Sequence, residues 1–156
     1  MDNLIGRNNP NYVAKDEYYT PAYIFEKLNF VFDLDVAAPV QDLSNVTASA
    51  SYNIQTDGLS SNWYGTVWMN PPFSKAKPWV EKFMAHGNGI ALLPASKALW
   101  FEQIWDMADG ISVLGNQLKF EYEGKTKKGI FMPCMLFAIG ETCANVLKNA
   151  GFSRVR

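Results

Sequence analysis

A four-residue segment near the middle of the chain, Asn70-Pro71-Pro72-Phe73, has the residue types needed to activate an exocyclic amine. The nitrogen of such an amine is a poor nucleophile, because its lone pair is delocalised into the attached ring. Two hydrogen-bond acceptors aimed at its two N–H bonds favour tetrahedral geometry and localise the lone pair. The Asn70 side-chain oxygen supplies one acceptor, and a backbone carbonyl, most simply that of Pro71, supplies the other. Acceptors fixed in advance stabilise the positive charge that develops on the nitrogen.

The residues around these acceptors suit the same chemistry. The two prolines restrict the backbone, and Phe73 offers a flat face on which a base can stack. Ser74 and Lys75 follow as candidate substrate-binding residues, with Ser74 also a candidate cap for the next helix. The simpler interpretation is an ordinary strand-to-helix turn in which Phe73 packs into the core. We favour the functional interpretation, because a rare tetrapeptide lies between an expected strand and an expected helix.

Apolar periodicity predicts strands that alternate with helices. The expected helices are one over 21–29 that Thr20-Pro21 begins, one through Trp79 and Met84 that ends at Gly87, one that Ser96 caps and Gly110 ends, and one that Thr142 caps and Gly151 ends. The expected strands are 30–36, 66–69, 90–93, 111–114, 134–139 and 152–155, with a hairpin over 116–131. Residues 1–15 are expected to form an irregular arm, and residues 40–62 irregular structure or one weak element.

This alternation favours an α/β fold with a mostly parallel sheet and helices on both faces, to which the C-terminal hairpin adds an antiparallel strand. Ligands bind such sheets at the carboxyl ends of the strands. The loops after Val36 and after Met69 are therefore expected to form the site. We expect one compact domain over 1–156, with no separate target-recognition domain.

Composition excludes several other classes of protein. Of the 156 residues, 48% are apolar and 19% are charged, which suits a packed core and argues against intrinsic disorder. The longest apolar run, 130–139, is shorter than the roughly 20 residues of a membrane span, and the N-terminus lacks a signal-peptide pattern. Cys134, Cys143 and the single histidine, His86, do not form a metal-binding motif. We expect a cytoplasmic protein without a metal site or a membrane partner.

Several short segments, in their order and spacing, resemble one known family. These segments are 16–21, 33–38, 56–59 with Trp63, 67–74, 79–80, 92–95 and 118–120. Together they resemble the phage-type DNA adenine-N6-methyltransferases, often called Dam-like. The resemblance implies a Rossmann-like fold, S-adenosylmethionine (AdoMet) as the methyl donor, and a flipped-out adenine of double-stranded DNA as the acceptor. It also implies a chain that is encoded by a phage or prophage and works in the host-cell cytoplasm, with GATC as the family's expected target.

The resemblance also implies roles for individual residues. Asn70, Pro71, Pro72 and Phe73 match the catalytic loop. Three groups of residues match cofactor-binding positions, together with Asn70. Tyr19, Thr20 and Pro21 match the segment beside the methionine end of AdoMet, and Asp35, Ala37 and Ala38 match the loop after the first strand. Asp57 matches an acidic contact to the adenine or ribose of AdoMet.

Several of these residues also have ordinary structural interpretations, and two features depart from the family pattern. Thr20-Pro21 is a common helix start, and Asp57-Gly58 is a common turn. The loop after the first strand has no glycine, and residues 40–56 show no second strand ending in an acidic residue, so no ribose ligand is assigned.

The same catalytic loop suits RNA or protein-glutamine methylation. An inactive relative that binds AdoMet or DNA is a further alternative.

Lysines concentrate in the expected hairpin, which we expect to contact DNA. They are Lys119, Lys125, Lys127 and Lys128, with Tyr122 as a candidate base contact, and Lys75 and Lys77 lie beside the catalytic loop. A solvated surface hairpin is the alternative. The net charge of −1 argues against a general polyanion binder, so this local cluster would have to supply the phosphate contacts. The chain is expected to act as a monomer or a homodimer.

Overall fold

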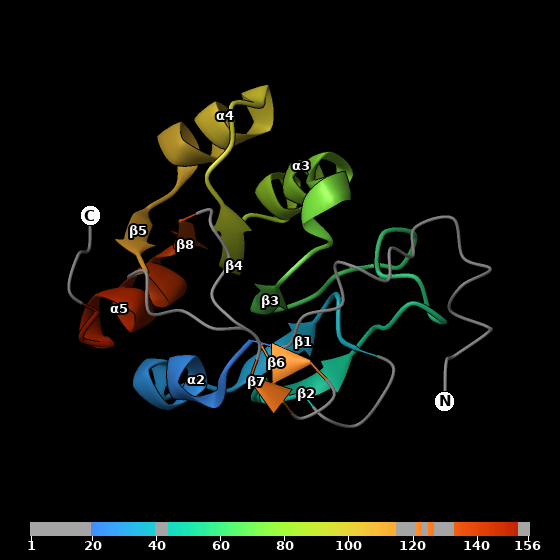
Figure 1. The fold of residues 1–156 in the computed structure, drawn as a ribbon, viewed down its shortest axis with the longest axis horizontal. Coiled ribbons are helices and arrows are strands. Elements are labelled where there is room, and N and C mark those ends of the chain that lie inside the picture. The colour runs from blue at the N-terminus through green and yellow to red at the C-terminus, as the bar shows by residue number, and fades with distance from the viewer. Residues whose placement is uncertain (1–19, 40–43, 115–120, 123–124, 127–132, 153–156) are drawn as a thin grey trace.

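A computed structural model describes residues 20–39, 44–114, 121–122, 125–126 and 133–152 (Figure 1). The arm expected over 1–15 lies outside the described residues, as do most of the strand expected at 152–155 and most of the hairpin segment. Four of the candidate site residues also lie outside them, namely Tyr19, Lys119, Lys127 and Lys128.

Six strands of the described chain form one mixed sheet. They are β1 (Phe32–Asp35), β2 (Ala48–Ser51), β3 (Val67–Met69), β4 (Gly89–Pro94), β5 (Gly110–Val113) and β8 (Cys134–Ile139). Their order across the sheet is β2-β1-β3-β4-β8-β5. The first four are parallel to one another, while β8 is antiparallel to both β4 and β5. The expected α/β class is confirmed. The antiparallel strand of the sheet is β8, whereas the strands described within the expected hairpin form a ribbon of their own.

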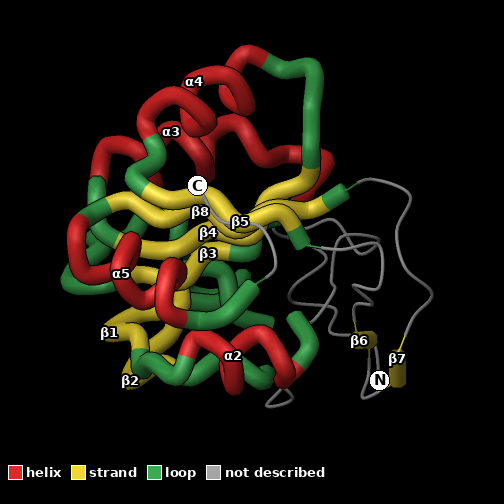
Figure 2. Tube along the Cα trace, turned by 90° about the vertical axis from the view of Figure 1, so that its left-hand side faces the viewer, coloured by secondary structure: helices red, strands yellow, loops and turns green. Residues whose placement is uncertain are grey.

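Helices cover both faces of this sheet (Figure 2). The α-helices in the described part of the chain are α2 (Ala22–Leu28), α3 (Ala76–His86), α4 (Leu99–Met107) and α5 (Glu141–Asn149). Helices α3 and α4 pack on one face, and α2 and α5 pack on the other. A separate two-strand ribbon, β6 (Glu121–Tyr122) and β7 (Lys125–Thr126), lies within the segment expected to form a hairpin.

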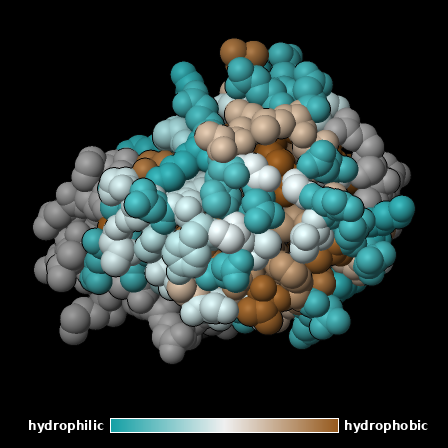
Figure 3. All heavy atoms as spheres, turned by 180° about the vertical axis from the view of Figure 1, so that it is seen from behind, coloured by the Kyte–Doolittle hydropathy of each residue, from teal (hydrophilic) through white to brown (hydrophobic). Residues whose placement is uncertain are grey.

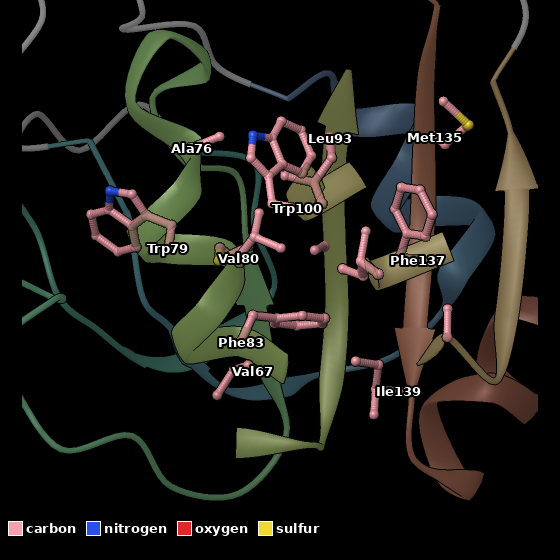
Figure 4. Packing of buried hydrophobic residues seen from close by; sticks show 14 of the residues in the cluster. Val67, Ala76, Trp79, Val80, Phe83, Leu93, Trp100, Met135, Phe137 and Ile139 are labelled. Atoms are coloured by element: carbon pink, nitrogen blue, oxygen red, sulfur yellow. The ribbon is translucent and has the colours of Figure 1, made fainter. Parts of the chain in front are cut away.

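The central strands are buried because both of their faces are covered. In β3, Val67 and Met69 pack towards α3, while Trp68 packs towards α2. All the residues of β4 and β8 are buried as well, which explains their nearly continuous apolar sequences. Figure 4 shows Phe83 of α3 lying between the helix and the sheet in this core.

The strand that sequence reasoning did not locate is β2. Its sequence is Ala48-Ser49-Ala50-Ser51, and only the two alanines are partly buried. Its pairing with β1 on one side, at the edge of the sheet, explains how small and polar residues form a strand here. Residues 40–62 therefore contain one short strand, as the expected single weak element, and this strand ends at Ser51 without an acidic residue.

The helix starts differ from the predicted ones. Pro21, rather than Thr20, is the residue that precedes α2. Its ψ of 149° is extended, so Pro21 is the last non-helical residue before the helix. Ser96 accepts a hydrogen bond from the Ala98 backbone N–H, just before α4 begins. Thr142 lies inside α5, which Gly140 precedes. These side chains were assigned as caps on local pattern alone, and none of the three helices has a side-chain hydrogen bond from its N-cap residue.

Viewed from behind, polar residues cover most of the surface, and hydrophobic ones form small separate areas (Figure 3). The large apolar side chains that are most exposed among the described residues include Val31, Leu99 and Met107. In the part of the chain that is described, each helix is too short or too polar to cross a membrane.

Replacing Phe83 with alanine tests the core that holds α3 against the sheet. The side chain is fully buried, so the substitution leaves a cavity and is expected to lower the free energy of unfolding by about 3–5 kcal/mol. Urea unfolding measures this change. The control is Glu81→Ala on the same helix, which removes an exposed side chain and is expected to change stability by less than about 0.5 kcal/mol. Equal effects of the two variants would contradict the assigned packing of α3.

Candidate active site

The two loops expected to form the site leave the sheet from adjacent parallel strands. Asp35 of β1 pairs with Trp68 of β3, and the Val36 backbone N–H donates to the Trp68 carbonyl at 3.1 Å. The residues that follow both strands therefore begin at the same side of the sheet, the one at which the parallel strands have their carboxyl ends. This side is called the carboxyl edge of the sheet below. This arrangement brings Asp35 and Asn70, which are 35 positions apart in sequence, to neighbouring strand ends.

Asn70 is held by a side chain from the beginning of the described chain. Its Nδ2 donates a hydrogen bond to Thr20 Oγ1 at 3.1 Å. Thr20 is 4% exposed and Asn70 is half-buried, so this contact is part-buried. Because the amide nitrogen is directed at Thr20, the amide oxygen lies on the other branch of the side chain. Sequence reasoning placed both residues beside the cofactor but did not foresee this bond.

The two prolines after Asn70 differ in what their carbonyls do. The Pro72 carbonyl accepts a hydrogen bond from the Lys75 backbone N–H at 3.1 Å, which closes the short 3-10 turn Phe73–Lys75. Among the described residues, no hydrogen bond to the Pro71 carbonyl is found. Ser74 lies within this turn, and α3 begins at Ala76 without a side-chain cap, so the expected capping role of Ser74 was wrong. The turn, rather than a serine hydroxyl, supplies the start of the helix.

Phe73 is only partly buried. It packs against the apolar cluster that α2 forms with the sheet, a cluster that includes Phe25 and Trp68. The structural and functional interpretations of Phe73 are therefore compatible, since the ring contacts the core while part of it stays accessible. Ser74 and Lys75 beside it are exposed.

Asp35 is a buried carboxyl group at the end of β1, with 3% of its surface exposed. One of its oxygens accepts a hydrogen bond from the Ala37 backbone N–H at 3.2 Å. Burial raises the pKa of Asp35 to about 7, and the bond from Ala37 opposes part of that rise. Among the described residues, no lysine, arginine or histidine forms an ion pair with it. Such a group is suited to a cationic ligand or to one that donates hydrogen bonds.

The loop after β1 is tied to the residue that follows β2. The Tyr52 backbone N–H donates to the Asp35 carbonyl, and the Ala38 N–H donates to the Tyr52 carbonyl, both at 2.8 Å. Ala37 and Ala38 are half-buried there. These backbone bonds hold the loop in one shape although it contains no glycine, which was the departure noted in the sequence.

Asp57 and Gly58 form a tight turn that packs against the carboxyl edge of the sheet. Asp57 adopts the left-handed conformation, with φ of 51°, and its carbonyl accepts a bond from the Ser60 N–H at 3.1 Å. A Cβ atom at Gly58 would overlap the Val36 carbonyl oxygen, so only glycine allows this approach. The turn interpretation is therefore confirmed, and the turn brings Asp57 near the end of β1.

Lys82 is a residue that sequence reasoning missed. From the middle of α3, its ammonium group donates to the carbonyls of Leu59 at 2.8 Å and Ser61 at 2.5 Å, and to that of Gly58 at 3.3 Å. It also lies 5.1 Å from the centre of the Trp63 ring. Lys82 thus fixes the loop that carries Asp57. Its position three residues after the buried Trp79, on the same helix face, was the available signal.

The remaining aromatic, histidine and cysteine residues have structural roles where they are described. Trp68 and Trp79 are buried, as expected. Trp63 is partly buried against the cluster on the α3 face of the sheet, which contains Trp79. Cys134 and Cys143 are buried thiols, and burial raises their pKa values to about 12 and about 11. His86 ends α3 and its Nε2 lies 2.7 Å from the Gly65 carbonyl oxygen. No group of metal-ligating side chains is found in the described ranges.

The segment between β5 and β8 starts and ends at the carboxyl edge of the sheet, which carries Asp35 and Asn70. Both β5 and the parallel strands run opposite to β8, so the end of β5 and the start of β8 lie at this edge. Within the segment, Tyr122 pairs with Lys125 in the β6–β7 ribbon. Figure 2 shows this ribbon beyond the same edge of the sheet.

A family model places this chain among known proteins. The model for DNA N-6-adenine-methyltransferase (Dam) matches residues 8–142, which include every strand of the sheet and the Asn70 to Phe73 loop. The chain belongs to the Dam family. This result confirms the resemblance found in the sequence segments.

A curated member of the family comes from Escherichia phage T1. That protein, a DNA N-6-adenine-methyltransferase, is 34% identical to this chain over 123 residues. The match covers 67% of this chain and 50% of the phage protein, so the chain spans about half the length of this relative. No solved structure matches the chain.

The buried Asp35 carboxyl makes a specific pH dependence of stability testable. Its folded pKa of about 7 is above the value of 3.8 for a solvated carboxyl, so its protonated form is favoured in the folded state. Stability is therefore expected to fall as pH rises from about 4 through about 7, by at most about 4 kcal/mol from this group. In Asp35→Asn this part of the pH dependence is expected to disappear, as measured by urea unfolding at about pH 5 and about pH 8.

The control for this measurement is Asp106→Asn, which removes an exposed carboxyl group on α4. It is expected to keep the wild-type difference in stability between the two pH values. If Asp35→Asn also keeps that difference, the burial of an uncompensated carboxyl at the end of β1 is refuted.

Proposed function

We propose that this chain is a phage-encoded methyltransferase that transfers a methyl group from AdoMet to the N6 amino group of adenine in DNA. One observation carries the proposal. In a member of the Dam family, the Asn70 to Phe73 loop leaves β3 beside the buried carboxyl group of Asp35 at the end of β1. We further propose that one Rossmann-like domain holds this site and acts in the host-cell cytoplasm.

The order of the strands supports the Rossmann-like assignment. From β1 the chain moves outward to β2, and it then returns to the other side of β1 as β3 and continues to β4. The order therefore reverses between β1 and β3. In open α/β sheets, ligands bind at the carboxyl ends of the strands where such a reversal occurs. Asp35 and Asn70 lie on the two sides of this position.

The residues at the carboxyl edge of the sheet fit AdoMet, which carries a positive charge and hydrogen-bond donors. We assign Asp35 to accept from the ammonium group or a hydroxyl, since it is buried and lacks an ion pair with the described cations. Ala37 and Ala38 permit close approach, and the Asp57 turn brings a second carboxylate to the same edge. When bound, AdoMet supplies a methyl group on a sulfonium, which is strongly electrophilic.

The Asn70 to Phe73 loop carries the two acceptors that we assign to the target amine. We assign the Asn70 side-chain oxygen and the Pro71 carbonyl to accept its two N–H bonds, since the Pro72 carbonyl is already used by Lys75. These acceptors stabilise the charge that forms on the nitrogen, and the methylated amine loses a proton to water. The accessible part of Phe73 offers a surface on which the base stacks. A base in a duplex reaches this loop only after it has been flipped out.

The decisive test is methylation of unmethylated double-stranded DNA with AdoMet, followed by digestion and detection of N6-methyladenine by mass spectrometry. The wild type is expected to form the product. Asn70→Ala is expected to lose at least about 100-fold in rate, because a preorganised acceptor is removed. The control Asn149→Ala, at an exposed position at the end of α5, is expected to keep the wild-type rate.

Other outcomes of this test would replace the proposal. RNA and glutamine-containing peptides serve as parallel acceptors, and methylation of either of them instead of DNA would assign a different substrate. Binding of AdoMet, measured by calorimetry, without methylation of any acceptor would identify an inactive relative.

The lysine-rich hairpin is tested by its effect on DNA binding. We expect the combined change of Lys125, Lys127 and Lys128 to glutamine to weaken binding and to reduce its salt dependence. The slope of log K against log salt is expected to fall by about 0.9 for each phosphate that a lysine no longer neutralises. The control changes Lys27 and Lys148, on α2 and α5, to glutamine and is expected to leave the slope unchanged. An unchanged slope in the triple variant would remove the hairpin from the DNA interface.

A further inference from the structure

The hydroxyl group of Thr20 contacts the side chain to which we assign the main catalytic role. Asn70 Nδ2 donates to Thr20 Oγ1 at 3.1 Å, and the two residues are 50 positions apart in sequence. Thr20 is 4% exposed. This part-buried hydrogen bond restricts the rotation of the Asn70 amide.

Thr20 is itself held from two sides. Its carbonyl accepts a hydrogen bond from Asn45 Nδ2 at 3.1 Å. The next residue, Pro21, is buried, has its φ fixed at −65°, and leads directly into α2. Helix α2 is anchored in turn by the fully buried Ile24. The hydroxyl group of Thr20 therefore has a fixed place relative to the sheet.

The direction of this hydrogen bond matters for the chemistry. The two branches of an asparagine amide are not equivalent, because the oxygen accepts hydrogen bonds and the nitrogen only donates them. An amine that must give up its N–H bonds needs the oxygen. By accepting from Nδ2, the Thr20 hydroxyl occupies the branch that cannot serve the amine and turns the oxygen away from itself.

We infer that Thr20 is a positioning residue that sets the rotation of the Asn70 amide for the transfer reaction. This inference rests on the proposed function, in which the Asn70 oxygen accepts from the target amine. It assigns the family's Thr-Pro segment a second task in this chain: the hydroxyl group serves the catalytic loop, and the proline serves the start of α2.

Two substitutions at Thr20 test the role. Thr20→Val keeps the shape of the side chain but removes the acceptor, and it is expected to lower kcat about tenfold, because a reacting group is left misoriented. The affinity for AdoMet and the KM for DNA are expected to stay within about twofold of wild type. Thr20→Ser restores a hydroxyl and is expected to recover most of kcat. The control Thr47→Val removes a hydroxyl that donates to the Phe30 carbonyl at the opposite edge of the sheet, and it is expected to keep the wild-type kcat.

An NMR measurement tests the contact without relying on activity. The side-chain NH2 signals of Asn70, assigned by their disappearance in Asn70→Ala, are expected to shift and exchange faster with water in Thr20→Val but not in Thr20→Ser. Unchanged signals in Thr20→Val would overturn the inference. So would a Thr20→Val enzyme with wild-type kcat and weakened AdoMet binding, because the hydroxyl would then be a cofactor ligand. A wild type that methylates no DNA, with the NMR shift still present, would refute the proposed function and leave the hydrogen bond established.

Discussion

The parallel pairing of β1 with β3 is the constraint on which the rest of the site depends. These strands are neighbours in the sheet, but β2 and its flanking loops separate them in sequence. Because neighbouring parallel strands end at one edge, the pairing requires Asp35 and Asn70 to lie at adjacent strand ends. The helices on the two faces cover the strands, and the edge where the strands end is the place left for ligands.

Several contacts around the site fix the loops that follow the strands. Lys82 donates hydrogen bonds to three backbone carbonyls of the loop that carries Asp57. Gly58 has no side chain and so lets the same loop contact the residue that follows β1. Backbone bonds through Tyr52 secure the loop after β1. These contacts explain how a site built from loops is kept in one geometry. Burial raises the pKa of the Asp35 carboxyl, so its ionised form is disfavoured in the folded chain. The presence of this carboxyl is consistent with binding at the carboxyl edge of the sheet.

Sequence patterns located the elements whose signal is local. Continuous apolar stretches marked β3, β4 and β8, because strands covered on both faces have only apolar surroundings. The sequence pattern did not locate the edge strand β2, because its Ala-Ser alternation has little apolar signal. This strand forms through its pairing with β1. The residues that precede α2, α4 and α5 differ from the predicted caps for a similar reason. A serine or threonine near a helix start has several bonding partners available, and the tertiary fold selects among them.

The sequence by itself determined the alternation of strands and helices, the Asn-Pro-Pro-Phe loop at a strand end, and, through the order of short segments, the family. These features are encoded by neighbouring residues and need no knowledge of distant contacts. Only the tertiary structure decided that Thr20 bonds to Asn70, that Asp35 is buried without a cation among the described residues, and that Lys82 fixes the Asp57 loop. Each depends on residues far apart in sequence or on burial by several elements, and no local pattern records which groups the folded chain brings together.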